Sequence, residues 1–316
     1  MEVVMLLNVQ NLTKVFSGKK STKTVANDNL SFSVQEGEIY GLLGHNGAGK
    51  TTLVNQIIGL MKPTSGEISL LGRSVIEDPA FARSMCSVQP QSQLPLGYLT
   101  PVQAVSIMGK MRSGDKQEVL KRMNMLFEAL DIGEWVNKEG VHLSGGVRRL
   151  VAFCMAVVVP GKLVILDEPT NDVDPIRRRY LWDLIRQLTV DGTSVILVTH
   201  NVIEAEKAVD RVAILNKGRF LAEGTPAEIK STVNNLIRVE VSHVTSIQQL
   251  QTPAWALSSN SQASRSVFSV NPDSVPDVIE WARNKVDEGE IMDYSLSPTT
   301  LEDVYVELTS KGEIGA

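Results

Sequence analysis

The sequence predicts an α/β fold in which helices cover a mostly parallel sheet, followed by a smaller α+β domain. Strand-like and helix-like segments alternate from residue 1 to about residue 230, with glycine turns between them. The strand-like runs at Ile39–Leu43, 163–166 and 195–198 are almost continuously apolar, as strands buried on both faces are. The pattern changes after about residue 232. We therefore expect one domain at residues 1–231 and a second at residues 232–316.

Within the first domain, residues of about 92–160 are predicted to form a helical subdomain. Its clearest helix is expected at 115–131, where one helical face carries Val119, Leu120, Met123, Leu126, Phe127 and Leu130. A hairpin is expected after the last core strand, because apolar runs at 212–215 and 219–222 flank Asn216-Lys217-Gly218. This hairpin gives the predicted sheet an antiparallel edge.

The second domain is expected to contain strands at 236–241 and 291–296 and a helix at 275–286. A final helix is predicted at 298–308, where Pro-Thr-Thr marks its start. The polar stretch 258–266 is predicted to be a loop.

Composition argues against two classes of function, although a local basic patch remains compatible with the net charge. The net charge of -5 lacks the basic field of a nucleic-acid binder, so we expect no nucleic-acid partner. The longest apolar run, 151–159, is shorter than the roughly 20 residues of a membrane-spanning helix. Residues 1–7 carry no signal-peptide pattern, and Cys86 and Cys154 are expected to be buried thiols in a reducing cytoplasm.

A phosphate-binding loop is predicted at residues 44–51, which fit G-x-x-x-x-G-K-[ST] between a strand and an apolar-faced helix at 52–60. Glycines let the backbone fold around a phosphate, and the helix N-terminus directs N–H groups at the anion. Lys50 is expected to reach the β- and γ-phosphates, and Thr51 to offer its hydroxyl to Mg²⁺. The predicted nucleotide ligands here are Gly44, His45, Asn46, Gly47, Ala48, Gly49, Lys50, Thr51 and Thr52.

Two adjacent carboxylates, Asp167 and Glu168, end the apolar strand at 163–166. Buried charges of this kind need compensation, which a metal ion and a polarised water supply. We expect Asp167 to bind Mg²⁺ and Glu168 to act on the attacking water.

These motifs resemble the ABC ATPases in order and spacing over about residues 5–230. The segments that carry the resemblance are 44–51, the signature Leu143-Ser144-Gly145-Gly146, 166–170 and His200. The Leu-Ser-Gly-Gly signature separates this family from other proteins with a phosphate loop. The resemblance implies ATP and Mg²⁺ as cofactors and ATP hydrolysis as the activity.

The resemblance also implies roles for further residues. Phe16 corresponds to the aromatic that stacks on adenine, although a core aromatic is the alternative. Gln91 corresponds to the glutamine that touches Mg²⁺ and senses the membrane partner; Gln89 is close by, but Gln91 fits the spacing to Leu99-Thr100. Asp174 corresponds to an aspartate at the dimer interface, and His200 to a γ-phosphate contact. Ser144, Gly145 and Gly146 correspond to the site that caps the γ-phosphate held by the opposite subunit.

The sequence departs from the family pattern around the signature. Val147 stands where glutamine is usual, and Leu150, Phe153 and Met155 stand where polar residues are common. Residues 158–161 replace a more polar turn. These changes bear on the strength of the signature half-site, while its Ser-Gly-Gly core is intact.

The resemblance implies a head-to-tail dimer, either a homodimer or a heterodimer with a related ATPase. Residues 296–305 resemble the tail of drug, antibiotic and lipid exporter ATPases, with a generic amphipathic helix as the alternative. The expected partner is a transmembrane permease on a separate chain, docked near residues 91–100 and the helical subdomain. The expected location is the inner face of the cell membrane. An importer subunit and a soluble, non-transport ABC ATPase are the alternatives.

Overall fold

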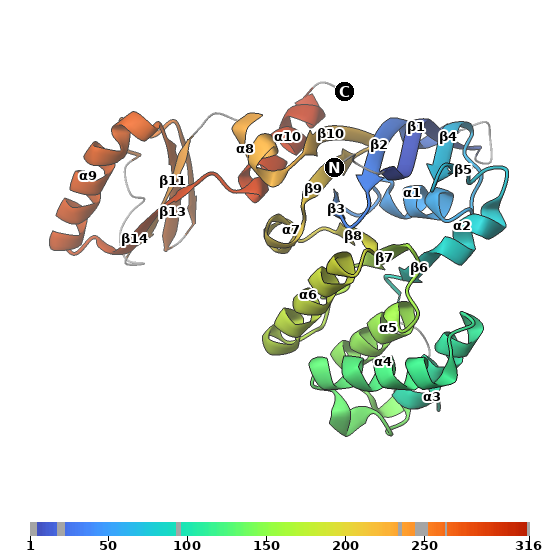
Figure 1. Cartoon of the computed structure of the whole chain (residues 1–316). Helices are drawn as coiled ribbons and strands as arrows, with labels where there is room; N and C mark the ends of the chain where they lie inside the picture. Colours follow the sequence, from blue (N-terminus) through green and yellow to red (C-terminus); the bar gives the residue numbers. More distant parts are fainter. Residues whose placement is uncertain are drawn as a thin grey trace. The chain divides into compact units, whose positions relative to one another are not determined.

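The computed structural model describes residues 5–17, 23–92, 96–232, 236–243, 252–262 and 264–314. The chain divides into two compact units, the first ending at Thr225 and the second beginning at Pro226 (Figure 1). This division precedes the expected boundary at residue 231. The helix α8 (Pro226–Thr232) falls in the second unit, where it packs against α10 (Leu301–Ile314).

The central sheet of the first unit is mostly parallel, as expected. Its strand order is β10-β9-β3-β8-β7-β6, and only β10 runs antiparallel to its neighbour. The strand bounds are β3 (Ile39–Leu43), β6 (Cys86–Gln89), β7 (Leu163–Asp167), β8 (Ser194–Thr199), β9 (Arg211–Asn216) and β10 (Arg219–Gly224). Every residue of β3, β7 and β8 is buried, which explains their continuous apolar sequences.

An antiparallel sheet accompanies the parallel one, and the sequence did not predict it. Its strand order is β2-β1-β4-β5, with bounds β1 (Met5–Ser17), β2 (Lys23–Gln35), β4 (Ser65–Leu70) and β5 (Arg73–Ser74). Leu7 and Val9 of β1 are buried in the same core as Leu42 of β3 and Ile165 of β7. The two sheets therefore share one core, which holds the strand before the phosphate loop in place.

Four helices join the strands of the first unit. They are α1 (Lys50–Ile57), α2 (Pro79–Met85), α6 (Pro175–Val190) and α7 (Val202–Ala208). The first begins immediately after the phosphate loop, with Gly49 at its N-cap position. Asp174 occupies the N-cap position of α6, and its carboxylate accepts hydrogen bonds from two N–H groups of the first turn.

The predicted helical subdomain consists of α3 (Pro101–Met111), α4 (Lys116–Ala129) and α5 (Gly145–Val157), which pack together (green in Figure 1). Thr100 and Gln103 form a capping box at the start of α3, and Asp115 caps α4. Five of the six apolar residues predicted for this helical face are buried: Val119, Met123, Leu126, Phe127 and Leu130. Leu120 is 52% exposed, so the buried stripe is narrower than predicted.

The second unit has an antiparallel sheet with strand order β12-β13-β11-β14 and a helix, α9 (Val275–Asp287), as expected of an α+β domain. The strand bounds are β11 (Ile237–His243), β12 (Ser258–Gln262), β13 (Arg265–Val270) and β14 (Ile291–Pro298). Val239, Val241, Phe268 and Val278 form its core, against which Trp255 and Trp281 pack.

One prediction for the second unit was wrong. The described residues of 258–266 are not a loop, because most of them lie in β12 and the start of β13. Strand β12 is an edge strand, and its polar sequence matches the limited burial of an edge. The last helix begins at Leu301, since Pro298 ends β14. Thr300 caps that helix by accepting from the Asp303 N–H, and the Asp303 carboxylate accepts from the Thr300 N–H in return.

No helix within the described ranges is long and apolar enough to cross a membrane. Cys86 and Cys154 are free and buried, as predicted. Burial raises the pKa of the Cys86 thiol to about 12 and raises that of Cys154 further.

Candidate functional site

A cavity of about 430 Å³ lies at the carboxyl ends of β3 and β7 in the first unit. It brings together the phosphate loop, the two carboxylates, the start of β2 and the turn of the β9–β10 hairpin. Its lining residues are Thr24, Val25, Ala26, Asn46, Gly47, Gly49, Lys50, Thr51, Thr52, Gln91, Asp167, Glu168, Lys217 and Gly218.

The predicted phosphate loop leads directly from β3 into α1. Gly47 and Gly49 have φ angles of 85° and 111°, which side chains other than glycine rarely adopt. A Cβ atom on Gly49 would also lie less than 3.0 Å from the carbonyl oxygen of Ala26. Glycine is therefore required at position 49 both by backbone conformation and by the close approach of β2.

Lys50 is 8% exposed and extends over its own loop. Its Nζ donates hydrogen bonds to the carbonyl oxygens of Gly44, at 2.6 Å, and His45, at 3.2 Å. Burial lowers the pKa of this ammonium group, while the nearby carboxylates of Glu168 and Asp167 oppose that shift. The ammonium group of Lys50 is therefore held between the phosphate loop and the end of β7.

Asp167 ends β7 at the cavity wall. Burial, followed by the neighbouring charge of Glu168, raises the pKa of Asp167 to about 6, against the opposing effect of Lys50 and Arg149. Because the pKa of Asp167 is raised, an adjacent cation would stabilise its ionised form. The described residues contain no cluster of three or more acidic, histidine or cysteine side chains able to hold a metal unaided. One carboxylate beside the Thr51 hydroxyl fits Mg²⁺, which takes few protein ligands and completes its shell with phosphate and water.

Glu168 is held by three hydrogen bonds at the ends of β7 and β8. Its Oε1 accepts from the backbone N–H of His200 at 2.9 Å and lies 2.5 Å from His200 Nδ1. Its Oε2 accepts from the Thr199 hydroxyl at 3.0 Å. The φ angle of Glu168 is 51°, in the left-handed region, so the backbone turns sharply after Asp167 and the two carboxylates diverge.

Gln91 and Gln89 lie in different places. Gln91 is exposed and lines the cavity, whereas Gln89 is fully buried at the end of β6 and donates through Nε2 to the Arg149 carbonyl oxygen. The Arg149 guanidinium donates to the backbone carbonyl oxygens of Pro90, at 3.1 Å, and Gln91, at 2.8 Å. The geometry thus places Gln91, as predicted by spacing, beside Asp167 and Thr51.

Several predicted ligands do not line the cavity. Gly44 and Ala48 do not line the cavity, and the His45 ring hydrogen-bonds the Asn46 carbonyl and Asn216 Oδ1. Phe16 is 39% exposed at the end of β1, opposite Thr24 of β2, with Lys14 Nζ 5.3 Å from its ring centroid. Phe16 is therefore a surface aromatic next to the cavity, not a core residue.

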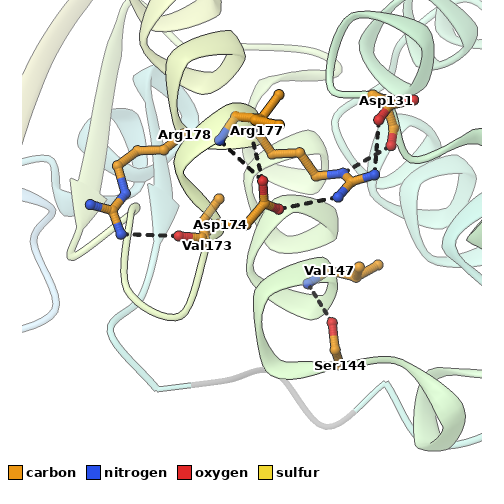
Figure 2. Close-up of polar contacts among 8 residues, drawn as sticks. Asp131, Ser144, Val147, Val173, Asp174, Arg177 and Arg178 are labelled. Atoms are coloured by element: carbon orange, nitrogen blue, oxygen red, sulfur yellow. Dashed lines mark hydrogen bonds and ion pairs between the residues drawn. The ribbon is translucent and has the colours of Figure 1, made fainter.

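The predicted signature residues start α5. The Ser144 hydroxyl accepts a 3.3 Å hydrogen bond from the Val147 N–H and so caps the helix (Figure 2). A Cβ atom on Gly146 would lie less than 3.0 Å from the carbonyl oxygen of Asp172. The side chain of Val147, which departs from the family pattern, is buried in the helical subdomain together with Leu150 and Phe153. These three departures therefore serve packing, whereas Met155 is half-buried.

Asp174 lies beside Arg177 at the start of α6. Its Oδ2 accepts a 3.2 Å hydrogen bond from the Arg177 guanidinium, which also donates to the Asp131 carboxylate at 2.8 Å (Figure 2). Burial is the largest single effect on Asp174 and raises its pKa, but the N–H groups and the guanidinium that face it together lower the pKa overall. The Arg177 guanidinium also lies 4.7 Å from the ring centroid of Trp135. One side chain thus joins α6 to the helical subdomain.

Sequence reasoning missed two parts of the cavity wall. Thr24, Val25 and Ala26 come from β2, and Lys217 and Gly218 come from the β9–β10 turn. The hairpin itself was predicted, but nothing in its sequence signals contact with the phosphate loop. Pairing of β9 with β3 brings the turn to that position.

A glycine-rich loop between strand and helix, a strand ending in two carboxylates and a shared cavity define a P-loop nucleotide-binding protein. A family model described as "ABC transporter" matches residues 27–171. The daunorubicin/doxorubicin resistance ATP-binding protein DrrA of Streptomyces peucetius is 29% identical over 311 residues, covering 96% of this chain and 92% of that protein. The Nod factor export ATP-binding protein I of Neorhizobium galegae is 30% identical over 309 residues, covering 97% and 86%.

The fold comparison agrees. A solved ATP-binding subunit of an ABC transporter is 28% identical, with a TM-score of 0.65, and the match covers 72% of this chain and 92% of that one. The chain therefore belongs to the ABC transporter family, and it is an ATP-binding, ATP-hydrolysing subunit of that family.

Proposed function

We propose that the chain is the ATPase subunit of an exporter, acting as a head-to-tail dimer on a separate transmembrane permease at the inner face of the cell membrane. The likeness to two ATP-binding proteins, one of drug resistance and one of Nod factor export, supports the export direction because it extends over nearly the whole chain. Both alignments include the second unit, which lies outside the residues matched by the family model. The importer and the soluble ATPase have no comparable observation in their favour.

The chemistry follows from residues that line the cavity, together with Phe16 and His200 beside them. The α1 N-terminus and Lys50 bind the phosphates, and Phe16 faces the adenine. Mg²⁺, held by Thr51, Asp167 and Gln91, would neutralise charge on the β- and γ-phosphates. Glu168, fixed by Thr199 and His200, orients the attacking water, and His200 contacts the γ-phosphate. The hydrogen bonds of Glu168 are the main support for this proposal, because they hold both oxygens of its carboxylate in a defined orientation beside Lys50.

The dimer would complete each site. In this arrangement the α5 N-terminus, with Ser144, Gly145 and Gly146, caps the γ-phosphate bound by the opposite subunit, and Asp174 lies at the interface. Ser144 is exposed at a helix N-terminus, which suits an anion. Closure requires that ATP bind the closed dimer more tightly than the open subunits.

A groove of about 720 Å³ in the first unit suits the permease. It lies between α1, β6, α3 and α5 and begins at Gln91, so a segment seated in it touches the wall of the nucleotide cavity. Its lining is predominantly apolar, with Ile58, Leu60, Met108 and Met155 among its residues. An apolar groove beside a nucleotide sensor supports the expected docking near residues 91–100.

Replacement of Glu168 by Gln tests the proposal. The variant keeps the size of the side chain but loses the charge that polarises water, so MgATP turnover should fall at least about a hundredfold while MgATP affinity persists. Light scattering should show an ATP-dependent dimer that ADP does not support. Undiminished turnover would remove Glu168 from the catalytic role, and failure of wild-type protein to bind MgATP would overturn the proposed function. Co-purification with a permease, and nucleotide-driven efflux from vesicles that contain both, tests the direction of transport.

A further inference from the structure

A second lysine contributes to the cavity that contains the phosphate loop. Lys217 lies at the tip of the β9–β10 hairpin and lines the cavity together with Lys50, Asp167 and Glu168. It has a φ angle of 47° and is exposed, and no described residue pairs with its ammonium group. A lysine that lines a nucleotide cavity and has no ion-pair partner among the described residues is free to bind an anionic ligand.

The hairpin tip is attached to the phosphate loop. The Gly218 N–H donates to the Ala48 carbonyl oxygen at 2.9 Å, and Asn216 Oδ1 lies 2.8 Å from His45 Nε2. On the other side, the Gly218 carbonyl oxygen accepts from the Asp28 N–H of β2 at 2.8 Å. These three bonds fix the backbone on both sides of Lys217, so its side chain starts from a defined point on the cavity wall.

The tip stands at the end of the cavity formed by β2. A Cβ atom on Gly218 would lie 2.9 Å from the Ala26 carbonyl oxygen, and Ala26 lines the cavity with Thr24 and Val25. Asp167 and Glu168 lie at the end of β7, which β3 and β8 separate from the hairpin in the sheet, and the γ-phosphate is expected there. With the adenine at Phe16, the α-phosphate lies between the base and these carboxylates, along the phosphate loop to which the hairpin tip is hydrogen-bonded.

We propose that Lys217 binds the α-phosphate of the nucleotide. This inference rests on the proposed function, which supplies the orientation of ATP in the cavity. An ammonium group is a compact point charge, and among the groups of a nucleotide it prefers phosphate oxygens. Because ATP and ADP share the α-phosphate, Lys217 stabilises both equally, whereas Lys50 discriminates between them through the γ-phosphate. It is a binding residue whose contribution appears in affinity for substrate and product alike.

Replacement of Lys217 by Asn provides the test, because Asn tolerates a positive φ and removes the charge without straining the turn. We expect the dissociation constants of both MgATP and MgADP to rise by the same factor, about fivefold to tenfold. The loss should appear mainly in KM, and affinity should depend less steeply on KCl than in wild type. Lys217→Arg should restore most of the affinity, and Lys62→Asn, at an exposed loop lysine outside the cavity, serves as the matched control.

Titration calorimetry with MgATP and MgADP separates the outcomes. Equal affinities of wild type and Lys217→Asn for both nucleotides, with wild type binding normally, would overturn the inference and leave the proposed function intact. A loss confined to MgATP would place the lysine at the γ-phosphate and equally overturn it. A change in the preference for ATP over GTP would place it at the base. Absence of binding in wild type would instead count against the proposed function.

Discussion

Gly146, at the start of α5, is packed so closely against the Asp172 carbonyl oxygen that no Cβ atom fits between them. The contact joins the signature segment to the loop that leads into α6. Gly146 is not one of the glycines with a positive φ. Glycine is therefore required at this position by the lack of space for a side chain and not by the backbone conformation. The two segments expected at the dimer interface are therefore in direct backbone contact within one chain.

Gly146→Ala should separate these segments. We expect the unfolding free energy to fall by about 1–3 kcal/mol, because the backbone must move to admit a methyl group. MgATP turnover should fall more than about tenfold, since Ser144 and Asp174 move apart with the segments. Gly133→Ala is the matched control, because a Cβ atom there meets nothing within 4 Å. Wild-type turnover and thermal stability in Gly146→Ala would contradict the packing argument.

The pKa of Asp167 predicts how stability depends on pH without nucleotide or metal. The folded chain holds this proton up to about pH 6, whereas the ordinary value is 3.8, so between those values the folded state binds more protons than the unfolded state. Stability should therefore decrease as the pH rises from about 4 to 6, by roughly 1–3 kcal/mol.

Asp167→Asn should remove that pH dependence and should be more stable than wild type at pH 7 in EDTA. The same variant should lose the stabilisation that MgATP gives to wild type. Thermal unfolding over pH 4–8, with and without MgATP, measures both effects. A wild-type profile that is flat between pH 4 and 6, or one that the variant shares, would show that Asp167 ionises normally.

Arg177 is predicted to stabilise the junction between α6 and the helical subdomain. Its guanidinium contacts the carboxylates of Asp131 and Asp174 and the Trp135 ring (Figure 2 shows the two carboxylates). Arg177→Ala should lower the unfolding free energy by about 1–2 kcal/mol, through loss of the ring contact and both ion pairs.

The Asp131 part of this junction should be small, because that carboxylate is exposed. A double-mutant cycle of Arg177→Ala with Asp131→Asn should give a coupling below about 1 kcal/mol. Asn keeps the positive φ of position 131. Arg179→Ala, at an exposed neighbour on α6, is the control. A coupling that accounts for the whole effect of Arg177→Ala would assign the junction to the ion pair alone.

The aromatic cluster of the second unit should determine the stability of that unit. The Trp281 ring makes edge contacts with Trp255, at a centroid distance of 5.3 Å, and with Phe268, at 6.1 Å. Trp281→Ala should destabilise the unit by about 3–5 kcal/mol. Hydrogen exchange in the full chain should show early loss of protection in β11 and β13, with β3 and β7 unchanged. Equal loss in both units would show that they unfold together.

The sequence predicted best those features whose chemistry is local. The phosphate loop, the carboxylates after β7 and the apolar strands of the parallel sheet are each contained in a few consecutive residues. The antiparallel sheet was missed because it depends on pairing between β1 and β4, which are far apart in the chain and do not alternate simply. Strand β12 was missed because a polar edge strand looks like a loop in sequence.

The cavity shows the same limit. Lys50 and Asp167 belong to recognisable motifs, whereas Lys217 reaches the cavity only because β9 pairs with β3 and returns through β10. The distinction between Gln89 and Gln91 needed the fold as well, since Gln89 is buried at the end of β6 and Gln91 lies beyond the strand and lines the cavity. Motif spacing identifies the binding residues that belong to the phosphate loop itself. Residues of the cavity wall that come from distant strands can be identified only once the pairing of those strands is known.

The cap on α5 has a consequence for an incoming phosphate. A hydroxyl can accept one hydrogen bond and donate another at once, so Ser144 keeps its O–H available while its oxygen holds the Val147 N–H. In the proposed dimer, docking of a second molecule's nucleotide would therefore break no hydrogen bond at this helix. An aspartate there, like Asp174 at the start of α6, would cap the helix N-terminus equally well but would repel the anion. Serine allows both the capping of the helix and the binding of a phosphate.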